Sequence, residues 1–247
     1  MKILFSPSEG KKEGGNNLLI SKESFVFPDL YEKREEVLKR YSNYLTTASD
    51  EQLLLLFGVK DVLKAQNLKR DIFTQPTLKA IRRYNGVAYD YLKYDSLNQD
   101  AKEYIDANTV IFSNLFGPVL ASNYLPFYKL KQGEKIDGFA LESFYRRYFS
   151  KSLDKFLQDE QLLDLRAGFY TKFYKPLIPY VTLKFLKNGK SVSHWAKAYR
   201  GIVLRHIALN NIQSMEELYK MDIENLKIEK IIQKKMHTEV IFTILSK

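Results

Sequence analysis

Residues 3–12 read ILFSPSEGKK, a short apolar strand that runs directly into a polar loop. Pro7 and Gly10 stop regular strand pairing, so the loop leaves the sheet where the buried strand ends. Folds of the α/β kind place their ligand sites at such strand ends. The stretch therefore predicts a buried first strand with a candidate binding loop beside it, and an ordinary solvated turn is the alternative.

The rest of the chain alternates helical and strand-like segments. A helical run is expected from about residue 30 to 44, and Ser49 is expected to cap a helix over 51–56. Strands separated by helices predict an α+β fold, with a mixed β-sheet surrounded by helices, and no linker or repeat divides residues 1–247 into more than a single domain. Further helices are expected near 60–68, 77–92, 98–107, 138–158 and 194–209, and strands near 109–113, 161–165, 179–186 and 239–245.

Composition narrows the class of protein. The 247 residues are 45% hydrophobic and contain no cysteine, which excludes a disulfide scaffold, a thiolate metal site and a cysteine nucleophile. No segment is long and apolar enough for a membrane span or a secretion signal. We expect a cytoplasmic monomer without a cofactor.

Charge is distributed unevenly along the chain. Residues 1–123 hold 17 Lys and Arg against 16 Asp and Glu, so most of the net charge of +10 lies in the second half. Between Asp164 and Glu216 there is no acidic residue. A positive field of this kind predicts a polyanionic partner, either DNA or a small anion. The basic residues of this acid-free segment are Arg166, Lys172, Lys175, Lys184, Lys187, Lys190, Lys197, Arg200 and Arg205.

Residues 53–65, LLLLFGVKDVLKA, predict two helices joined at Gly58. This arrangement resembles a helix-hairpin-helix, in which amides at the start of the second helix donate to a DNA phosphate. Lys60 and Lys64 would then follow the DNA backbone. Asp61 departs from the motif by adding a negative charge, and a plain packing element is the alternative reading.

Residues 193–205 predict a helix with a basic side. At 100° per residue, Lys197, Arg200 and Arg205 share one arc, and Gly201 lies within that arc, where a small residue would let an anion approach. A solvated basic face without a ligand is the alternative.

No familiar catalytic or metal-binding pattern is present. The three histidines, His194, His206 and His237, have no metal-ligand spacing, and His206 is expected in the core. An enzyme would need residues that are distant in the sequence to come together. The candidates for such a pocket are Glu9, Lys11, Tyr84, Tyr89, Asp164, Arg166, Tyr170, Lys197 and Arg200.

Six segments, taken in order, resemble the bacterial YaaA peroxide-stress family over nearly the whole chain. They are ILFSPSEGK (3–11), LFGVKD (56–61), AIRRYNGVAYDYL (80–92), SNLFG (113–117), DLRAGFY (164–170) and AKAYRG (196–201).

The resemblance implies a fold special to that family, a helix-hairpin-helix, a positively charged cleft, binding to duplex and distorted DNA, and a role in limiting peroxide damage linked to lower free iron. The chain departs from the pattern at residues 119–123 and 128–130, where an arginine and an aspartate of many members are missing and Lys129 is the candidate replacement. The family's signature positions fall here on Ser6, Pro7, Lys11, Tyr84, Gly86, Tyr89, Ser193, Lys197, Arg200, Gly201 and Arg205.

Two functions follow from these observations. Sequence-independent DNA binding needs only phosphate contacts, and the residues expected to make them are Lys11, Gly58, Lys60, Lys64, Arg166, Lys197, Arg200 and Arg205. The alternative is an enzyme that acts on a small anionic or nucleotide substrate in a pocket whose candidate residues include Ser6, Glu9, Tyr84, Tyr89, Lys129 and Tyr170. A long open groove would favour DNA, and a closed pocket would favour the enzyme.

Overall fold

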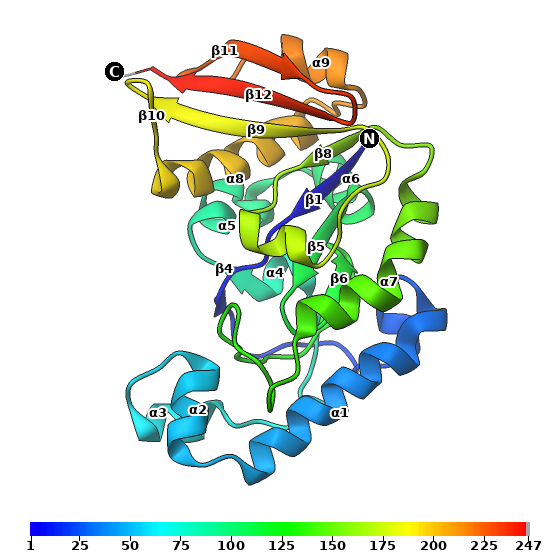
Figure 1. Ribbon diagram of the computed structural model, residues 1–247, viewed down its shortest axis with the longest axis vertical. Helices are drawn as coiled ribbons and strands as arrows, with labels where there is room; N and C mark the ends of the chain where they lie inside the picture. The colour runs from blue at the N-terminus through cyan, green and yellow to red at the C-terminus, as the bar shows by residue number, and fades with distance from the viewer. Residues whose placement is uncertain (246–247) are drawn as a thin grey trace.

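The computed structural model describes residues 1–245, and for Ser193 and His194 it describes the backbone alone. An eight-stranded mixed sheet runs through the molecule, with helices packed around it (Figure 1). Its strands are β1 (Lys2–Phe5), β5 (Thr109–Ser113), β6 (Gly117–Leu120), β8 (Leu162–Asp164), β9 (Tyr180–Lys187), β10 (Lys190–Ser191), β11 (Leu226–Gln233) and β12 (His237–Ile244). The helices are α1 (Tyr31–Thr47), α2 (Asp50–Phe57), α3 (Val62–Leu68), α4 (Ala80–Arg83), α5 (Val87–Leu92), α6 (Gln99–Asn108), α7 (Leu141–Leu157), α8 (Ser193–Leu209) and α9 (Met215–Lys220).

Five neighbouring strands of this sheet, β12-β9-β8-β1-β5, are parallel, while β6 and β11 are antiparallel edge strands. Ile3 of β1 pairs with Leu163 of β8 on one side and with Thr109 of β5 on the other. Because parallel strands end at the same edge, the loops that follow β1, β5 and β8 come together there. This is the edge that the residues after Phe5 were expected to occupy.

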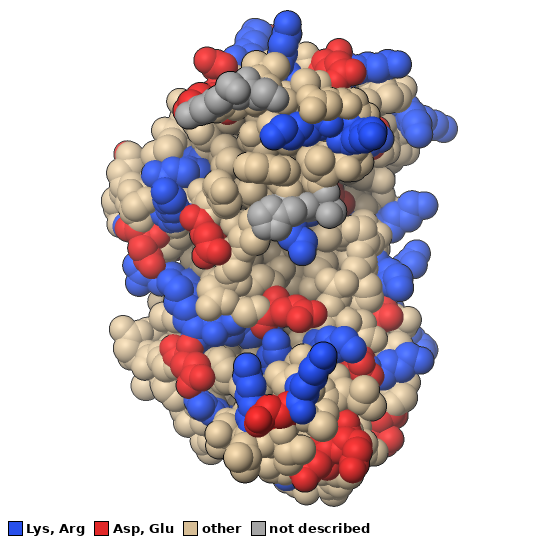
Figure 2. All heavy atoms as spheres, turned by 90° about the vertical axis from the view of Figure 1, so that its left-hand side faces the viewer, with Lys and Arg blue, Asp and Glu red and all other residues tan. Residues whose placement is uncertain are grey.

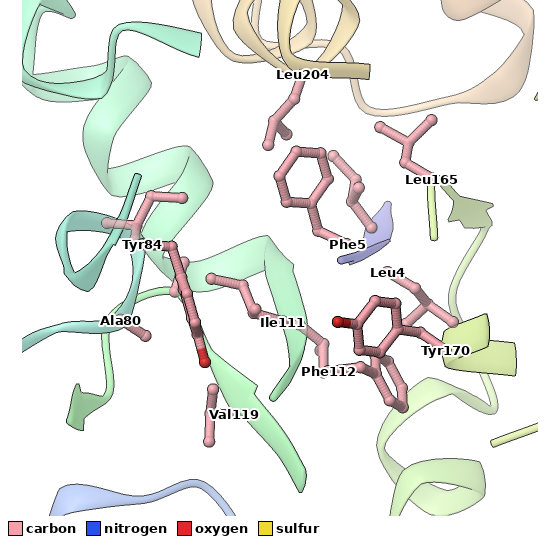
Figure 3. Packing of buried hydrophobic residues seen from close by; sticks show 14 of the residues in the cluster. Leu4, Phe5, Ala80, Tyr84, Ile111, Phe112, Val119, Leu165, Tyr170 and Leu204 are labelled. Atoms are coloured by element: carbon pink, nitrogen blue, oxygen red, sulfur yellow. The ribbon is translucent and has the colours of Figure 1, made fainter. Parts of the chain in front are cut away.

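The central strands are short and almost wholly apolar because the sheet is covered on both faces. Phe5, Ile111 and Phe112 lie in one packed cluster with Leu204 of α8 (Figure 3), and all four are at most 1% exposed. Tyr199 of α8 also stacks on Phe185 of β9, with 5.4 Å between the ring centroids. Helix α8 is therefore held against the sheet by its apolar side.

Most of the expected elements are present. Helices α1, α2, α6, α7 and α8 and strands β1, β5, β8, β9 and β12 lie where the patterns predicted them, and Ser49 caps α2 by accepting a hydrogen bond from the Gln52 amide. The expected helix over 77–92 is wrong. Residues 84–85 form a short strand, β4 (Tyr84–Asn85), that pairs with β2 (Gly10–Lys11), and Gly86 has a φ of 121°, so the helix is broken into α4 and α5. None of the helices within residues 1–245 is long and apolar enough to cross a membrane.

Helix α8 lies unusually close to α5. A Cβ atom added at Gly201 would stand 1.9 Å from the carbonyl oxygen of Ala88 and 3.1 Å from the amide nitrogen of Leu92, both backbone atoms of α5. Gly201 was expected to face an approaching anion. It is buried instead and is needed for helix packing.

Arg34 closes one edge of the sheet. Its side chain is fully buried between the rings of Phe25 and Phe149, at 4.4 and 5.0 Å from the guanidinium carbon, and no described carboxylate pairs with it. The guanidinium donates to the carbonyl oxygens of Phe116 and Pro118, the latter at 3.2 Å, along edge strand β6. A buried charge is retained here because it satisfies carbonyl groups that have no neighbouring strand.

Candidate functional site

A cavity of about 380 Å³ lies at the carboxyl ends of β1 and β8. Five parts of the chain form its walls: the loop after β1, Asn85 with the start of α5, Gln132, the segment after β8, and one side of α8. Figure 2 shows the face on the left of Figure 1, which is hollowed and has Lys and Arg side chains above and below the hollow, with acidic residues among them. The residues around the cavity include Ser6, Ser8, Glu9, Asn85, Tyr89, Gln132, Ala167, Tyr170, Lys197 and Arg200.

The loop after β1 is fixed by hydrogen bonds to three other segments. The hydroxyl of Ser6 accepts from the Ala167 amide at 2.7 Å, and the hydroxyl of Tyr89 donates to the Ser6 carbonyl at 2.9 Å. The Glu9 carboxylate accepts from the Gln132 amide at 3.2 Å. A wall that is already ordered loses little conformational entropy when it binds a ligand.

Tyr170 supplies an unpartnered hydroxyl to the cavity. The residue is 3% exposed, and no described residue forms a hydrogen bond with its hydroxyl group. Burial raises the pKa of Tyr170, and neighbouring Tyr84 and Glu9 raise it further, so the hydroxyl stays protonated at neutral pH. A hydroxyl at a cavity wall without a protein partner favours a ligand that accepts a hydrogen bond from it.

Lys197 and Arg200 bring positive charge to the cavity from α8. Lys197 is exposed and Arg200 is half-buried, and neither side chain forms an ion pair or hydrogen bond with another described residue. Burial lowers the pKa of Arg200, whereas the charge of Asp164 raises it. A guanidinium stays charged at neutral pH even so. The two cations are therefore available to an anion.

Arg166 and Arg205 lie elsewhere, contrary to their expected role at the surface. Arg166 is buried in a two-pronged ion pair with Asp164, with Nε–Oδ1 and Nη2–Oδ2 distances of 2.9 and 2.7 Å, and it also donates to the carbonyls of Tyr170 and Tyr174. Arg205 donates to the Leu92 carbonyl at 3.0 Å at the end of α5. Of the basic arc on α8, only Lys197 and Arg200 reach the cavity, because Arg205 is used in packing.

Lys11 and Lys129 lie beneath the loop, and neither lines the cavity with Lys197 and Arg200. The amine of Lys11 donates to the carbonyls of Ser8 and Glu9 at 3.1 and 3.3 Å and rests 4.3 Å from the centre of the Tyr128 ring. Lys129 donates to the same Glu9 carbonyl at 3.3 Å. Both lysines therefore bind the backbone of the loop and stabilise its conformation.

Tyr84 lies in a buried chain of hydroxyl groups and not at the cavity wall. Its hydroxyl is 2.9 Å from that of Tyr128, which in turn is 2.8 Å from the hydroxyl of Ser113 at the end of β5. Burial raises the pKa of Tyr84 to about 12, so it is protonated at neutral pH. The side chains of Ser193 and His194 lie outside the described part of the structure.

The unusual environment of Lys11 gives a pH-dependent prediction. Burial lowers the pKa of Lys11 from its ordinary 10.5 to about 7, and the charge of Lys129 lowers it while Glu9 raises it. Between pH 7 and pH 10.5, which are about the folded and the unfolded pKa of Lys11, the unfolded chain keeps the proton that the folded chain has lost, so the free energy of unfolding rises with pH. Replacing Lys11→Met should remove this rise, as measured by urea denaturation at pH 7 and pH 9.5.

The exposed neighbour Lys12 provides the matched control. Lys12→Met removes the same charge outside the buried environment and should keep the pH dependence of the parent. Equal pH dependence of the parent and Lys11→Met would show that the amine is not held in a desolvated place.

The expected helical pair is present as α2 and α3, joined at Gly58 with a φ of 64°. Two details bear on phosphate binding. The Asp61 carboxylate accepts from the Lys64 amide at 2.6 Å and so occupies a donor at the start of α3. A Cβ atom at Gly58 would lie 2.9 Å from the side chain of Lys131, which places the turn against the 131–132 segment. Lys60 and Lys64 are exposed.

Three residues around the cavity were not named as site candidates from the sequence. Asn85, Gln132 and Ala167 come from a short strand and two loops whose position depends on contacts between distant segments. Their residue types are common in loops, so spacing alone does not mark them. Asn85 and Ala167 do lie within two of the recognised segments, 80–92 and 164–170, and these segments were the available clues.

The chain thus forms an α+β protein with a cation-bearing cavity at the carboxyl edge of a parallel set of strands. A model of the peroxide stress protein YaaA family matches residues 1–231. The chain belongs to the YaaA peroxide-stress family, as its six sequence segments indicated.

Several relatives cover most of the chain. An uncharacterized protein of Campylobacter jejuni is 48% identical over 245 residues, which is 99% of this chain and 100% of the relative. UPF0246 proteins of Corynebacterium efficiens and Streptomyces coelicolor are 32% and 30% identical, and cover 84% of this chain in both cases and 85% and 82% of their own length. The Campylobacter jejuni relative matches over nearly the whole of both chains, and the family model spans the loop, α5 and α8 that build the cavity.

Proposed function

We propose that this protein binds duplex DNA through backbone phosphates, without reading sequence, as part of the response to peroxide stress. The observation that carries the proposal is the scarcity of ion pairs in the acid-free segment between Asp164 and Glu216. Of its nine basic residues, only Arg166 pairs with a carboxylate among the described side chains. Cations that are not paired with carboxylates attract a polyanion, and they break few ion pairs when they bind it.

Lys197 and Arg200 are the proposed central contacts, because both line the cavity and have no other described partner. Lys184, Lys187 and Lys190 lie on the β9–β10 hairpin, which precedes α8 directly. A DNA backbone bound to α8 could therefore meet further cations from the same segment. This arrangement needs no acid–base chemistry, so DNA binding does not require the arginine and aspartate that other family members carry.

The salt dependence of duplex binding tests this proposal. Each neutralised phosphate contributes about 0.9 to the slope of log affinity against log salt concentration for duplex DNA. Fluorescence anisotropy with duplexes of unrelated sequence, measured from low to moderate salt, should give the same steep slope for each. A flat response would contradict phosphate binding.

The α2–α3 pair is proposed as a second phosphate contact, in the manner of a helix-hairpin-helix. Lys60→Ala should then lower duplex affinity and reduce the salt slope by about one unit, because one exposed cation is lost. Gly58→Val should lower affinity as well, since a β-branched residue disfavours a positive φ and would press on Lys131. The measurement is anisotropy on variants verified as folded by circular dichroism.

Asp61→Asn tests whether the α2–α3 pair contacts phosphate or serves packing alone. It removes a negative charge at the start of α3 and keeps an N-cap side chain. Tighter duplex binding is expected if DNA reaches the turn. If both Lys60→Ala and Asp61→Asn bind DNA like the parent, residues 53–65 serve packing alone.

A second candidate function is an enzyme for a small anionic or nucleotide substrate in the same cavity. The unpartnered hydroxyl of Tyr170 favours it, because phosphate contacts by Lys197 and Arg200 leave this donor at the cavity wall without an acceptor. Glu9, at the exposed part of the same loop, is the proposed acid–base group.

A further inference from the structure

The cavity has an apolar part that phosphate binding does not explain. Side chains without polar groups form much of its wall, and three of these residues, Phe5, Pro7 and Leu165, are buried. A phosphate alone gains nothing from such a surface, whereas a flat heterocycle does. The apolar residues around the cavity are Phe5, Pro7, Val87, Ala88, Leu165 and Ala167.

The polar groups beside this apolar surface are of a kind that pairs with the edge of a base. Asn85 and Gln132 each present a carboxamide, which has both a donor and an acceptor, and no described residue forms a hydrogen bond with either carboxamide. Carboxamides of this kind bind base edges in nucleic-acid complexes. Tyr170, which lines the same cavity, adds a third unpartnered group, its hydroxyl.

Positive charge completes the set. Lys197 is exposed and Arg200 is half-buried, so the cations extend from the rim into the cavity. The apolar surface suits the face of a base, the carboxamides suit its edge, and the cations suit the phosphate of a nucleotide. The volume of about 380 Å³ is at the lower end of the range for small-molecule sites, roughly 300–1,000 Å³, and suits one nucleotide.

We propose that the cavity binds a single nucleotide unit, with the base against the apolar wall and the phosphate on Lys197 and Arg200. The nucleotide has two sources. It is either a free mononucleotide or a residue of bound DNA that has turned out of the helix, as enzymes that act on bases require. The second source rests on the proposed DNA binding, and the first does not.

The first arm of the test uses free mononucleotides, with inorganic phosphate as the reference. Isothermal titration calorimetry with AMP, GMP, CMP and dTMP should show at least one that binds about tenfold more tightly than phosphate. Ala167→Trp fills the cavity and should abolish this difference. Tyr170→Phe removes one hydrogen bond with little change of shape and should weaken binding by about three- to tenfold.

The second arm uses a duplex that contains one 2-aminopurine opposite a mismatched base, which lowers the cost of turning the base out. Binding of the duplex is followed by anisotropy and the position of the base by 2-aminopurine fluorescence. We expect a fluorescence change at saturating protein, and Ala167→Trp, compared at its own saturating concentration, should lack that change.

The outcomes separate the two proposals. Duplex binding without a fluorescence change, together with mononucleotides that bind no better than phosphate, would overturn the nucleotide pocket and leave DNA binding intact. Absence of duplex binding would overturn the proposed function, and the mononucleotide arm would then decide the pocket by itself. A signal that persists in Ala167→Trp would place the nucleotide elsewhere and overturn the assignment.

Discussion

Lys197→Glu combined with Arg200→Gln is expected to lower duplex affinity by roughly 100-fold at low salt. Each residue is proposed to hold a phosphate, and a hydrogen bond to a charged group contributes about 1.5–3 kcal/mol, so the loss of two contacts gives at least this factor. The loss should be equal for unrelated sequences, and the salt slope should fall by about two units. Anisotropy over a salt series measures both quantities.

Glutamine is chosen at position 200 for a structural reason. Arg200 is half-buried and lies within the electrostatic influence of Asp164, so a glutamate there would add repulsion between carboxylates and confuse binding with stability. The matched control is Lys227→Glu with Lys230→Gln, which removes the same charge from exposed positions on edge strand β11. If the two double variants lose affinity equally, the overall positive charge of the protein accounts for DNA binding, and α8 makes no specific contacts.

Gly201→Ala is expected to destabilise the protein by about 3 kcal/mol, at the upper end of the range for overpacked cores. The sign of the effect is informative. In an isolated helix, the same substitution stabilises by roughly 1 kcal/mol, because alanine is the better helix former. Here the new methyl group would meet the Ala88 carbonyl at 1.9 Å, and a backbone carbonyl of α5 has no rotamer with which to move aside.

Chemical denaturation measures the change in stability, and Gly168→Ala provides the control. Gly168 has no neighbour within 4 Å of an added Cβ atom, so the same substitution should be tolerated there. Helices α5 and α8 also carry Tyr89, Lys197 and Arg200, so any folded Gly201→Ala protein should show weakened ligand binding as well. A higher melting temperature for Gly201→Ala would mean that α5 and α8 are farther apart than described.

Local sequence patterns predicted the elements that depend on local features. The Ser49 cap, the apolar run of β5 and the helical run of α1 each depend on residues that are close together in the sequence, and each element formed as expected. The break at Tyr84–Gly86 was missed because it depends on pairing between β4 and β2, which is some 70 residues away in the chain. Strands β6 and β11 were missed for a related reason, since their pairing partners set their conformation more than their own composition does.

The candidate site was predicted in part. The loop after β1 and the basic residues of α8 do meet, because parallel strands deliver their loops to one edge. Counting charge could not separate Lys197, which is exposed, from Arg166, which is buried against Asp164. A helical wheel likewise showed Gly201 and Arg200 on one side without showing that α5 covers the glycine.

The guanidinium of Arg34 has a consequence for self-association. An unpaired sheet edge is a template on which another chain can add a strand, and Arg34 occupies part of the β6 edge by binding the Pro118 carbonyl and the Phe116 carbonyl just before the strand. The other edge, β11, is protected by exposed Lys227 and Lys230 and by a register irregularity between Ile228 and Lys230. Salt screens exposed charges and leaves a buried guanidinium unaffected, so concentrated salt would weaken the protection of β11 alone. Any fibre or strand-exchanged dimer that forms under such conditions should therefore grow from the β11 end of the sheet.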